Sequence, residues 1–470
     1  MKSNYFLFFI LVSFYAIACG GRNQNKNANI DSSLIKRVDV ISILPKDSII
    51  SKVICAANPS MSYALYIPSS KNDKPLPVVY FFDPHGDGLL PVKKYKSLAD
   101  SFHFILAGSN NSKNGNNLDD AGNIFTAMKD DLGKRTKVNT GRIYLCGFSG
   151  GAKVATYLAL HFPEIKGIIA NGAGLEDITH AGDFTFSYTA IAGEGDLNMT
   201  DLASIDNFLD KTNTRHSIIY FDGIHEWAPE TTMAIAFEGW QLEAMRDKII
   251  PADTLFIHRF ATQMKQIVDK KMKQNQLIRA QQNCKLAATM LQGFQDERDW
   301  FVQKQSAIAQ SNIFQQQKSE RQQLLALEEK LKSGYQQKFA DTDAGYWEKT
   351  INEVKAKAQL KNAQAPMYQR LQAYLSLAFY TISNQMINRN ENKIAEFFVA
   401  LYKMADPTNS EAWYFSAILD ARNNDASQTK KDLEKAIALG FNDKKRLMQQ
   451  PEFAKENLDI HLNEIEKQIK

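Results

Sequence analysis

Short apolar runs alternate with longer amphipathic stretches between about residues 53 and 240 of the 470-residue chain. Several of the runs are continuously apolar, as expected for strands that are covered on both faces in a parallel sheet. This alternation predicts an α/β fold, with a mostly parallel sheet flanked by helices. The expected strands are Tyr63–Ile67, Val78–Phe82, Phe104–Ala107, Ile143–Cys146, Gly167–Ala170, Tyr188–Ala192 and Ile218–Phe221.

The pattern changes after Trp240. Strand-like runs disappear, Gln, Lys, Glu, Ala and Leu dominate, and apolar residues recur at helical spacing as far as Lys470. We therefore expect the second half to be all-α and helical. The expected breaks between its helices are Gly293, Ser333 with Gly334, Gly345 and Pro366.

The C-terminal region contains two stretches that look like successive units of one repeat. In the clearer one, Asp406–Ala417 opens a helix and Leu433–Gly440 closes its partner, which resembles a tetratricopeptide repeat. A weaker unit precedes it and starts near Pro366. A generic helical hairpin domain is the alternative. Because two repeats do not form a stable stack alone, we expect helices from about Asp253 to Ala365 to pack beside them.

The N-terminus resembles a signal peptide at residues 1–18. One basic residue, Lys2, precedes the apolar run Tyr5–Tyr15, which is too short to span a bilayer as a helix. The small residues Ala16–Ala18 followed by Cys19 resemble a bacterial lipobox, which implies lipidation of the Cys19 thiol. Ordinary cleavage by signal peptidase at the same place is the alternative.

A lipid on Cys19 would place the protein in the cell envelope, periplasmic or surface-exposed, with the membrane as a partner. Residues 20–33 are rich in Gly, Asn, Gln and Lys, which predicts a flexible tether. Gly20 stands where an acidic residue commonly signals inner-membrane retention, so the resemblance favours the outer membrane.

The composition predicts a folded and nearly neutral protein. Hydrophobic residues make up 44% and charged residues 23%, and the net charge is +4. No basic stripe with interleaved aromatic residues is present, which argues against nucleic acid as a partner. Beyond Cys19 the chain has only Cys55, Cys146 and Cys284, so at most one disulfide is possible, and Cys146 is expected to be a small buried hydrophobe.

A Gly-x-Ser-x-Gly sequence stands where a strand leads into a helix. Within Arg142–Gly151, an apolar strand runs into Gly147, Ser149 and Gly151, and an apolar helix follows. This is the context of a nucleophile elbow, where the serine lies on a strained turn and flanking side chains would collide with backbone. Ser149 is therefore the expected nucleophile. The amide of Gly150, at the helix N-terminus, is expected to stabilise an oxyanion.

An acid is expected after the serine, on a loop that follows a later strand. Asp196 stands in such a loop, beyond Tyr188–Ala192, and is the expected acid. Its carboxylate would fix the tautomer of the catalytic histidine and stabilise the imidazolium. The alternatives are Glu194, Asp201 and Asp183.

The histidine is expected last in chain order, because a serine hydroxyl is a poor nucleophile until an imidazole takes its proton. His225 follows the strand Ile218–Phe221 and is the expected base. The main alternative is His180.

A second oxyanion donor is expected in the glycine-rich loop Asp83–Gly88, which follows an early strand. Backbone amides near Gly86 and Asp87 would act beside the amide of Gly150.

Taken together, residues from about Cys55 to Trp240 resemble an α/β-hydrolase, nearest the secreted esterase and polyester-depolymerase branch. The resemblance implies ester hydrolysis with no cofactor and no metal. One motif departs from the family pattern of Gly-x-x-Asp, an apolar residue and often a proline, because Asp196–Met199 fits it only in part. The motifs that carry the resemblance are Asp83–Gly88, Gly147–Gly151 and Gly223–Trp227.

The expected organisation has five parts. They are a signal peptide at 1–18, a lipid-anchored tether and entry segment at 19–50, an α/β-hydrolase domain at 51–248, a helical region at 249–365 and a tetratricopeptide-like helical domain at 366–470.

Three functions are open at this point. The first is a serine hydrolase that cleaves a small-molecule or polymeric carboxylic ester through an acyl-enzyme on Ser149. The second is a non-catalytic cell-envelope protein, with the hydrolase fold as a scaffold and the helical half binding a protein partner. The third is a peptidase of the same fold, because triad geometry does not distinguish ester from amide cleavage.

Overall fold

The computed structural model describes residues 44–70, 74–174, 183–454 and 460–469. The predicted signal peptide, Cys19, the tether and His180 lie outside these ranges. The chain divides into two compact units. The first contains the described residues up to Gly193 together with Asn198–Phe221 and His225–Gln317, and the second contains Glu194–Leu197, Asp222–Ile224 and the chain from Lys318 onward.

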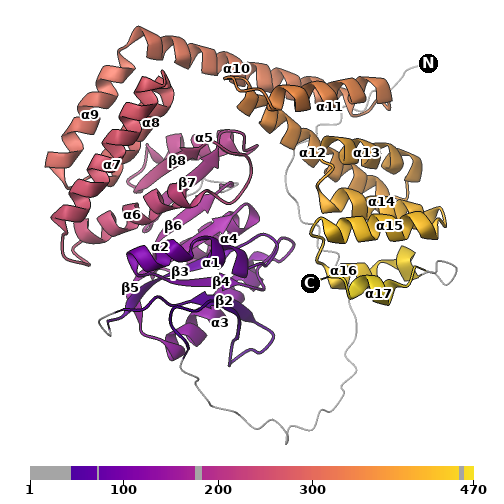
Figure 1. Cartoon of the computed structure of the whole chain (residues 1–470), viewed down its shortest axis with the longest axis horizontal. Coiled ribbons are helices and arrows are strands. Elements are labelled where there is room, and N and C mark those ends of the chain that lie inside the picture. Colours follow the sequence, from indigo (N-terminus) through magenta and orange to yellow (C-terminus); the bar gives the residue numbers. More distant parts are fainter. Residues whose placement is uncertain (1–43, 71–73, 175–182, 455–459, 470) are drawn as a thin grey trace, which may run out of the picture. The chain divides into compact units, whose positions relative to one another are not determined.

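The first unit is built on an eight-stranded sheet with the order β1-β2-β4-β3-β5-β6-β7-β8 (Figure 1). Strands β3 to β8 run parallel, whereas β2 pairs antiparallel with both β1 and β4. This mostly parallel, helix-flanked sheet is an α/β-hydrolase fold and confirms the predicted fold class. The strands are β1 Ile50–Ile54, β2 Ser62–Tyr66, β3 Leu76–Phe82, β4 Ile105–Ser109, β5 Val138–Phe148, β6 Ile165–Asn171, β7 Ser187–Gly193 and β8 His216–Phe221.

All seven expected strands are present, and β1 was not expected. Its burial alternates poorly, with Ser51, Lys52 and Ile54 exposed, because it lies at the edge of the sheet. An edge strand with so few buried residues gives little periodic signal in the sequence.

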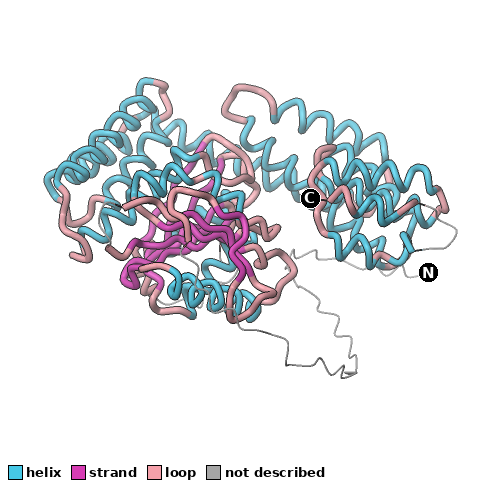
Figure 2. Tube along the Cα trace, turned by 60° about the horizontal axis from the view of Figure 1, so that its bottom comes forward, coloured by secondary structure: helices cyan, strands magenta, loops and turns pink. Residues whose placement is uncertain are grey.

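Helices cover both faces of the sheet, as Figure 2 shows. Adjacent residues of β3 point to opposite faces: Tyr80 meets Phe125 edge-on at 5.2 Å between ring centroids, whereas Phe81 stacks on Tyr95 at 5.9 Å. Both faces are therefore apolar, which explains the continuous hydrophobic runs. The helices of this unit are α1 Leu89–Lys94, α2 Lys96–Phe102, α3 Leu118–Arg135, α4 Gly150–His161, α5 Met199–Leu209, α6 Glu230–Arg246, α7 Thr254–Lys273, α8 Leu277–Met290 and α9 Gln295–Ala309.

Helices α7 to α9 belong to the sheet-containing unit. Phe260 and Phe301 share one hydrophobic core with Trp240 of α6, and Trp240 stacks on Tyr144 of β5 at 4.4 Å. The boundary between the compact units thus falls at Gln317, and the boundary expected at residue 248 does not coincide with it. Composition changes where the strands end, whereas packing continues through three further helices.

The second unit has a helical core of its own around Trp347, Phe379 and Tyr414. Helices α12 and α13 form one hairpin and α14 and α15 another, each pair being joined by a short loop. The tetratricopeptide-like character of these pairs stays a prediction. The helices are α10 Asn312–Lys338, which begins in the first unit, α11 Ala344–Ala358, α12 Ala365–Asn388, α13 Asn392–Ala405, α14 Ser410–Arg422, α15 Ala426–Ala438, α16 Lys444–Gln449 and α17 Leu462–Glu466.

One expected break is absent, because Ser333 and Gly334 lie inside α10. A glycine in an exposed helix costs only about 1 kcal/mol relative to alanine, so a long helix tolerates it. Gly293 does separate α8 from α9, and Pro366 lies in the first turn of α12.

The three cysteines of the described chain are free and buried. Burial raises the pKa of the Cys146 thiol well above its ordinary value, as expected for a small hydrophobe in a strand. Among the described residues, no helix is both long enough and apolar enough to cross a membrane.

Candidate active site

Ser149 lies on a sharp turn between β5 and α4. Its φ of 52° and ψ of −121° are unusual for a residue with a side chain. The amide of Ser149 donates a 2.9 Å hydrogen bond to the carbonyl of Asn171, at the end of β6. The expected strand, turn and helix are therefore present, and the turn holds the serine in a strained conformation.

Close packing around the turn explains two of its glycines. A Cβ atom on Gly147 would lie 2.0 Å from the carbonyl oxygen of Gly151, and a Cβ on Gly151 would lie 1.9 Å from that of Phe82. Both contacts are with backbone, which cannot rotate away. Any other residue would push α4 away from β3 and β5.

The hydroxyl of Ser149 lies 3.0 Å from Nε2 of His225. His225 comes from the loop after β8, and both residues are half-buried, so a small molecule can reach them. The ring of Phe148 lies 4.8 Å from the imidazole and limits its movement. The structure thus brings together the serine and histidine predicted from sequence, at hydrogen-bonding distance for proton transfer.

Asn171 supports this pair and was not identified from the sequence. Its side-chain Oδ1 accepts a 2.8 Å bond from the amide of Ala228, and its Nδ2 donates to the carbonyl of Glu226 at 3.3 Å. Together with its backbone bond to Ser149, these contacts tie the elbow to the loop of His225. The available signal was a polar residue at the end of an apolar strand, which by itself is weak.

The loop after β3 is joined to the histidine loop through Asp83. This buried carboxylate accepts a 2.8 Å bond from Nε1 of Trp227 and another from the amide of His85. Burial alone would raise the pKa of Asp83, but the hydrogen bonds from His85 and Trp227 outweigh it and hold the pKa below 3.8. Asp83 is therefore an ionised anchor between two of the motifs.

The expected oxyanion amides differ in their availability. The amide of Gly86 donates a 3.1 Å bond to the carbonyl of Asp83 and closes a turn, so it does not serve a ligand without breaking that bond. This is a correction to the expectation for Gly86, because sequence does not show which amides a turn consumes. Asp87 remains a candidate.

Gly150 faces Asn114, a second residue that sequence analysis missed. A Cβ on Gly150 would lie 1.9 Å from the side-chain oxygen of Asn114. The backbone amide of Asn114 is fixed by a 2.8 Å bond to the carbonyl of Pro84. The asparagine loop therefore borders the elbow.

The acid candidates differ in burial and in their partners. Asp196 is fully buried and follows β7 by three residues. Asp183 is exposed and accepts bonds from the backbone and side chain of Asn213, and Glu194 forms an ion pair with Arg321 at 3.2 Å. Asp201 is exposed in the first turn of α5. Asp183 and Glu194 are therefore engaged with Asn213 and Arg321.

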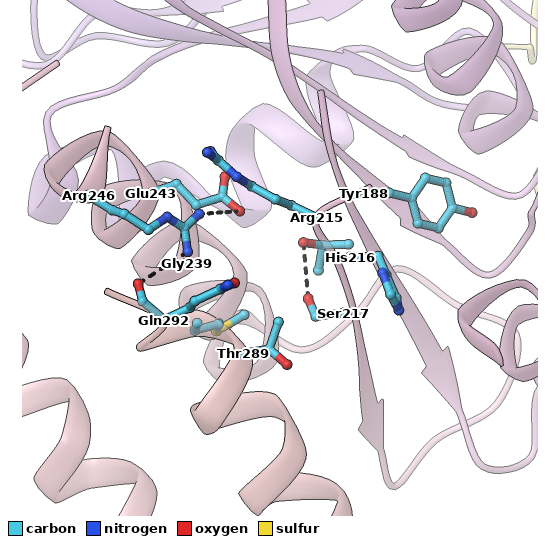
Figure 3. Close-up of a pocket in the computed structure, with 11 residues that line it drawn as sticks. Tyr188, Arg215, His216, Ser217, Gly239, Glu243, Arg246, Thr289 and Gln292 are labelled. Carbon is cyan, nitrogen blue, oxygen red and sulfur yellow. Dashed lines mark hydrogen bonds and ion pairs between the residues drawn. The ribbon is translucent and has the colours of Figure 1, made fainter. Parts of the chain in front are cut away.

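A small cavity of about 30 Å³ lies elsewhere in the first unit (Figure 3). Residues at the amino ends of β7 and β8 line it, whereas Ser149 follows the carboxyl end of β5. Glu243 and Arg246, three residues apart on α6, form an ion pair in its wall at 3.8 Å. Its volume is that of about one water molecule, so this cavity is not the substrate site.

A cluster of acidic and histidine side chains also lies away from Ser149. Asp206, Asp210 and His216 come close enough to share a cation. The ammonium group of Lys285 already lies 3.0 Å from both carboxylates. The cluster is therefore an ion-pair network that fixes α5 to α8.

No protein-family model matches the chain, and no curated protein sequence matches it. Several solved structures are similar in part. An esterase from the archaeon Pyrobaculum calidifontis is 14% identical, with a TM-score of 0.34 over 43% of this chain and 85% of the esterase.

Two bacterial proteins give similar values. Esterase B from Lactobacillus rhamnosis is 13% identical, with a TM-score of 0.35 over 43% of this chain and 88% of its own. The fluorophosphonate-binding serine hydrolase F of Staphylococcus aureus is 11% identical, with a TM-score of 0.35 over 42% of this chain and 99% of its own. The α/β-hydrolase fold assigned above rests on the strand order and connections of the sheet itself.

Proposed function

We propose that the protein is a serine hydrolase that cleaves carboxylic esters, with Ser149 as nucleophile, His225 as base and Asp196 as the acid. The observation that carries the proposal is the 3.0 Å contact between Ser149 Oγ and His225 Nε2 on a strained elbow. A half-buried serine with a histidine at hydrogen-bonding distance from its hydroxyl is the arrangement that activates a nucleophile. The strained backbone at Ser149 supports the same conclusion.

The reaction has two steps. His225 takes the proton of Ser149 as Oγ attacks the ester carbonyl, and the imidazolium then gives that proton to the departing alcohol. Water repeats the sequence on the acyl-enzyme: His225 accepts its proton, the hydroxide adds to the acyl carbon, and Ser149 leaves with the proton returned. Asp196 would stabilise the imidazolium in both steps, which its burial after β7 supports.

The negative charge on the carbonyl oxygen needs donors at the elbow. Gly150 begins α4, so its amide and the partial positive charge of the helix N-terminus lie next to Ser149. Asp87 supplies the second amide in this proposal, because the amide of Gly86 is used in a turn.

Labelling with a fluorophosphonate probe tests the proposal. The soluble form from about Asn27 onward should be labelled in the wild type, and both Ser149→Ala and His225→Ala should abolish labelling. A folded wild-type protein that is not labelled would contradict a serine hydrolase and support the scaffold hypothesis.

Matched substrates then separate ester from amide cleavage. Esters and amides of the same acyl groups, from acetyl to longer chains, should show hydrolysis of the esters only. Amide hydrolysis of similar rate would identify a peptidase instead.

We further propose that the mature protein is anchored to the bacterial envelope through a lipid on Cys19, which lies outside the described residues. The lipobox-like order Ala16–Ala18 before Cys19 supports this. Expression of the full chain with a labelled fatty acid should give a labelled, membrane-bound product. The variant Cys19→Ser should remain unlabelled, and equal labelling of the variant would contradict the anchor.

A further inference from the structure

The loop that carries Asp196 is held by a buried arginine of the helical unit. Arg370 of α12 donates from Nη1 to the backbone carbonyl of Glu194. Another edge of the guanidinium binds Glu328 of α10, with Nη2 at 2.6 Å and Nε at 2.9 Å from Oε2. Only 5% of the Arg370 side chain and 1% of the Glu328 side chain are exposed, so the guanidinium is fixed in orientation.

The bond from Arg370 falls on one particular peptide group. The carbonyl of Glu194 and the amide of Gly195 belong to the same peptide plane, and that amide donates a 2.8 Å bond to the carbonyl of Gly223. The plane is therefore held at both ends, by α12 on one side and by the loop before His225 on the other. Asp196 is the next residue.

Two further contacts fix the same loop. Arg321 of α10 pairs with the carboxylate of Glu194 at 3.2 Å. A Cβ on Gly195 would lie 2.2 Å from the side-chain oxygen of Gln369, so the loop packs directly against α12. Three contacts from two helices, together with the bond to Gly223, thus converge on the two residues that precede Asp196.

A gain in stability does not by itself explain why the ion pair between Arg370 and Glu328 is buried. A buried pair is often no more stable than apolar side chains of the same volume, because the charges lose their hydration. A guanidinium that donates from two edges instead specifies one geometry for the groups that it joins. The acid of a serine hydrolase needs such precision, because an error of about 1 Å lowers the rate by about 100-fold.

From these contacts we infer that Arg370, oriented by Glu328, is a positioning residue for Asp196, and that the helical half of the chain thereby sets the reactivity of Ser149. The inference rests on the proposed function. It assigns the helical half a part in the reaction, in addition to any partner that it binds.

The variant Arg370→Lys tests the inference in the full-length soluble chain. Lysine keeps the charge opposite Glu328 but cannot reach the carbonyl of Glu194 at the same time. A displaced carboxylate stabilises the imidazolium of His225 less. We therefore expect fluorophosphonate labelling of Ser149 to slow by about 10- to 100-fold, and the acidic limb of its pH profile to move to lower pH.

Arg422→Lys is a matched control within the same unit. Arg422 pairs with Glu452 at 2.8 Å, has a side chain that is 13% exposed, and donates to a backbone carbonyl, that of Ile387. Arg422 thus makes the same two kinds of contact as Arg370, an ion pair and a bond to a backbone carbonyl, and these contacts do not involve the loop of Asp196. Its labelling rate should stay within about twofold of the wild-type rate, and its pH profile should keep its position, because substitutions away from special structural features have small effects.

A second variant guards against misfolding. The double variant Arg370→Met with Glu328→Met removes both buried charges, and Lys332, which pairs with Glu328 at 3.0 Å, keeps Glu329 at 3.1 Å. It should show the same slow labelling and the same shift in pH profile. Wild-type labelling in both folded variants, or an equal loss in Arg422→Lys, would overturn the inference.

Hydrogen exchange separates this inference from the proposed function. The amides of residues 194–197 should exchange faster in Arg370→Lys than in wild type, whatever the activity. If the wild type is not labelled at all, the proposed function fails, and the catalytic part of the inference fails with it. Unchanged exchange in an active protein would overturn the positioning role alone.

Discussion

The indole Nε1 of Trp227 donates a 2.8 Å hydrogen bond to Oδ2 of Asp83, and so joins two loops that are 144 residues apart in the chain. One loop carries Asp87 and the other carries His225. The bond is buried, and Trp227 also packs edge-on against Phe81 of β3 at 6.1 Å. A single tryptophan therefore sets the spacing between the expected oxyanion loop and the base.

Replacing Trp227 by phenylalanine should lower stability. The ring packing survives, but the buried carboxylate of Asp83 loses a donor, which costs about 1–3 kcal/mol. Urea unfolding followed by circular dichroism at pH 7 measures the change. The control Trp413→Phe removes an exposed indole bond to the carbonyl of Pro407 and should change stability by less than about 0.5 kcal/mol.

The same pair predicts a pH dependence. The folded-state pKa of Asp83 is held below its ordinary value of 3.8, so its contribution to stability is complete above that pH and is lost as the pH falls through the folded-state pKa. The stability difference between wild type and Trp227→Phe should therefore be largest near neutral pH and shrink below about pH 4. A difference that grows on acidification would contradict an ionised Asp83.

Gly151→Ala should destabilise the elbow. The new Cβ would lie 1.9 Å from the carbonyl oxygen of Phe82, and the backbone must shift to relieve it. We expect a loss of about 2–3 kcal/mol, together with slower labelling of Ser149, measured by thermal unfolding and fluorophosphonate kinetics. In the control, Gly133→Ala meets nothing within 4 Å in α3 and should stabilise the helix by up to about 1 kcal/mol.

Asn171→Ala should impair the reaction more than the fold. It removes the side-chain bonds to Ala228 and Glu226 that hold the loop of His225, while the backbone bond to Ser149 stays. Labelling should slow by about 10- to 100-fold. Asn213→Ala, which removes a bond to the exposed Asp183, should label at the wild-type rate. Wild-type labelling of Asn171→Ala would show that the loop is held without it.

Glu238 in α6 predicts a second pH effect, of opposite sign. Burial raises its pKa to about 7, against weaker opposing effects of Arg259 and Gln263. The folded state therefore binds the proton more tightly than the unfolded state, and stability falls as the pH rises from 4.5 to about 7. Glu238→Gln should remove this fall and be more stable than wild type at pH 8 by about 1–3 kcal/mol.

Unfolding midpoints at pH 5 and pH 8 measure the effect of Glu238→Gln. The stability of the variant relative to wild type should increase from pH 5 to pH 8. A constant difference at both would contradict the raised pKa of Glu238.

The motifs of the hydrolase half could be recognised from the sequence because each of them is local. The Gly-x-Ser-x-Gly sequence at Gly147–Gly151 requires a tight turn whatever surrounds it, and the structure shows the strained serine and the crowded glycines. His225 was identified because it follows a late strand, and the carboxyl ends of parallel strands lie along one edge of the sheet. Chain order and strand polarity together therefore predicted a serine beside a histidine.

The residues that hold the site together could not be recognised from the sequence, because their role depends on partners far away in the chain. Asn171 resembles any polar residue at a strand end until its bonds to Ser149 and Ala228 are seen. Gly86 was expected to serve the oxyanion, yet its amide is used in a turn. Which backbone groups remain available is decided by the turn that the loop adopts.

The sequence by itself determined the order of strands and helices, the elbow at Ser149 and the place of His225, because these follow from periodicity and from local backbone strain. Only the tertiary structure decided that the sheet-containing unit extends to Gln317, and that Arg370 reaches the loop before Asp196. Both depend on contacts between segments that are separated in the chain, by 176 residues in the case of Arg370 and Glu194. Neither leaves a periodic or local signal, since each partner residue is unremarkable in its own stretch of sequence.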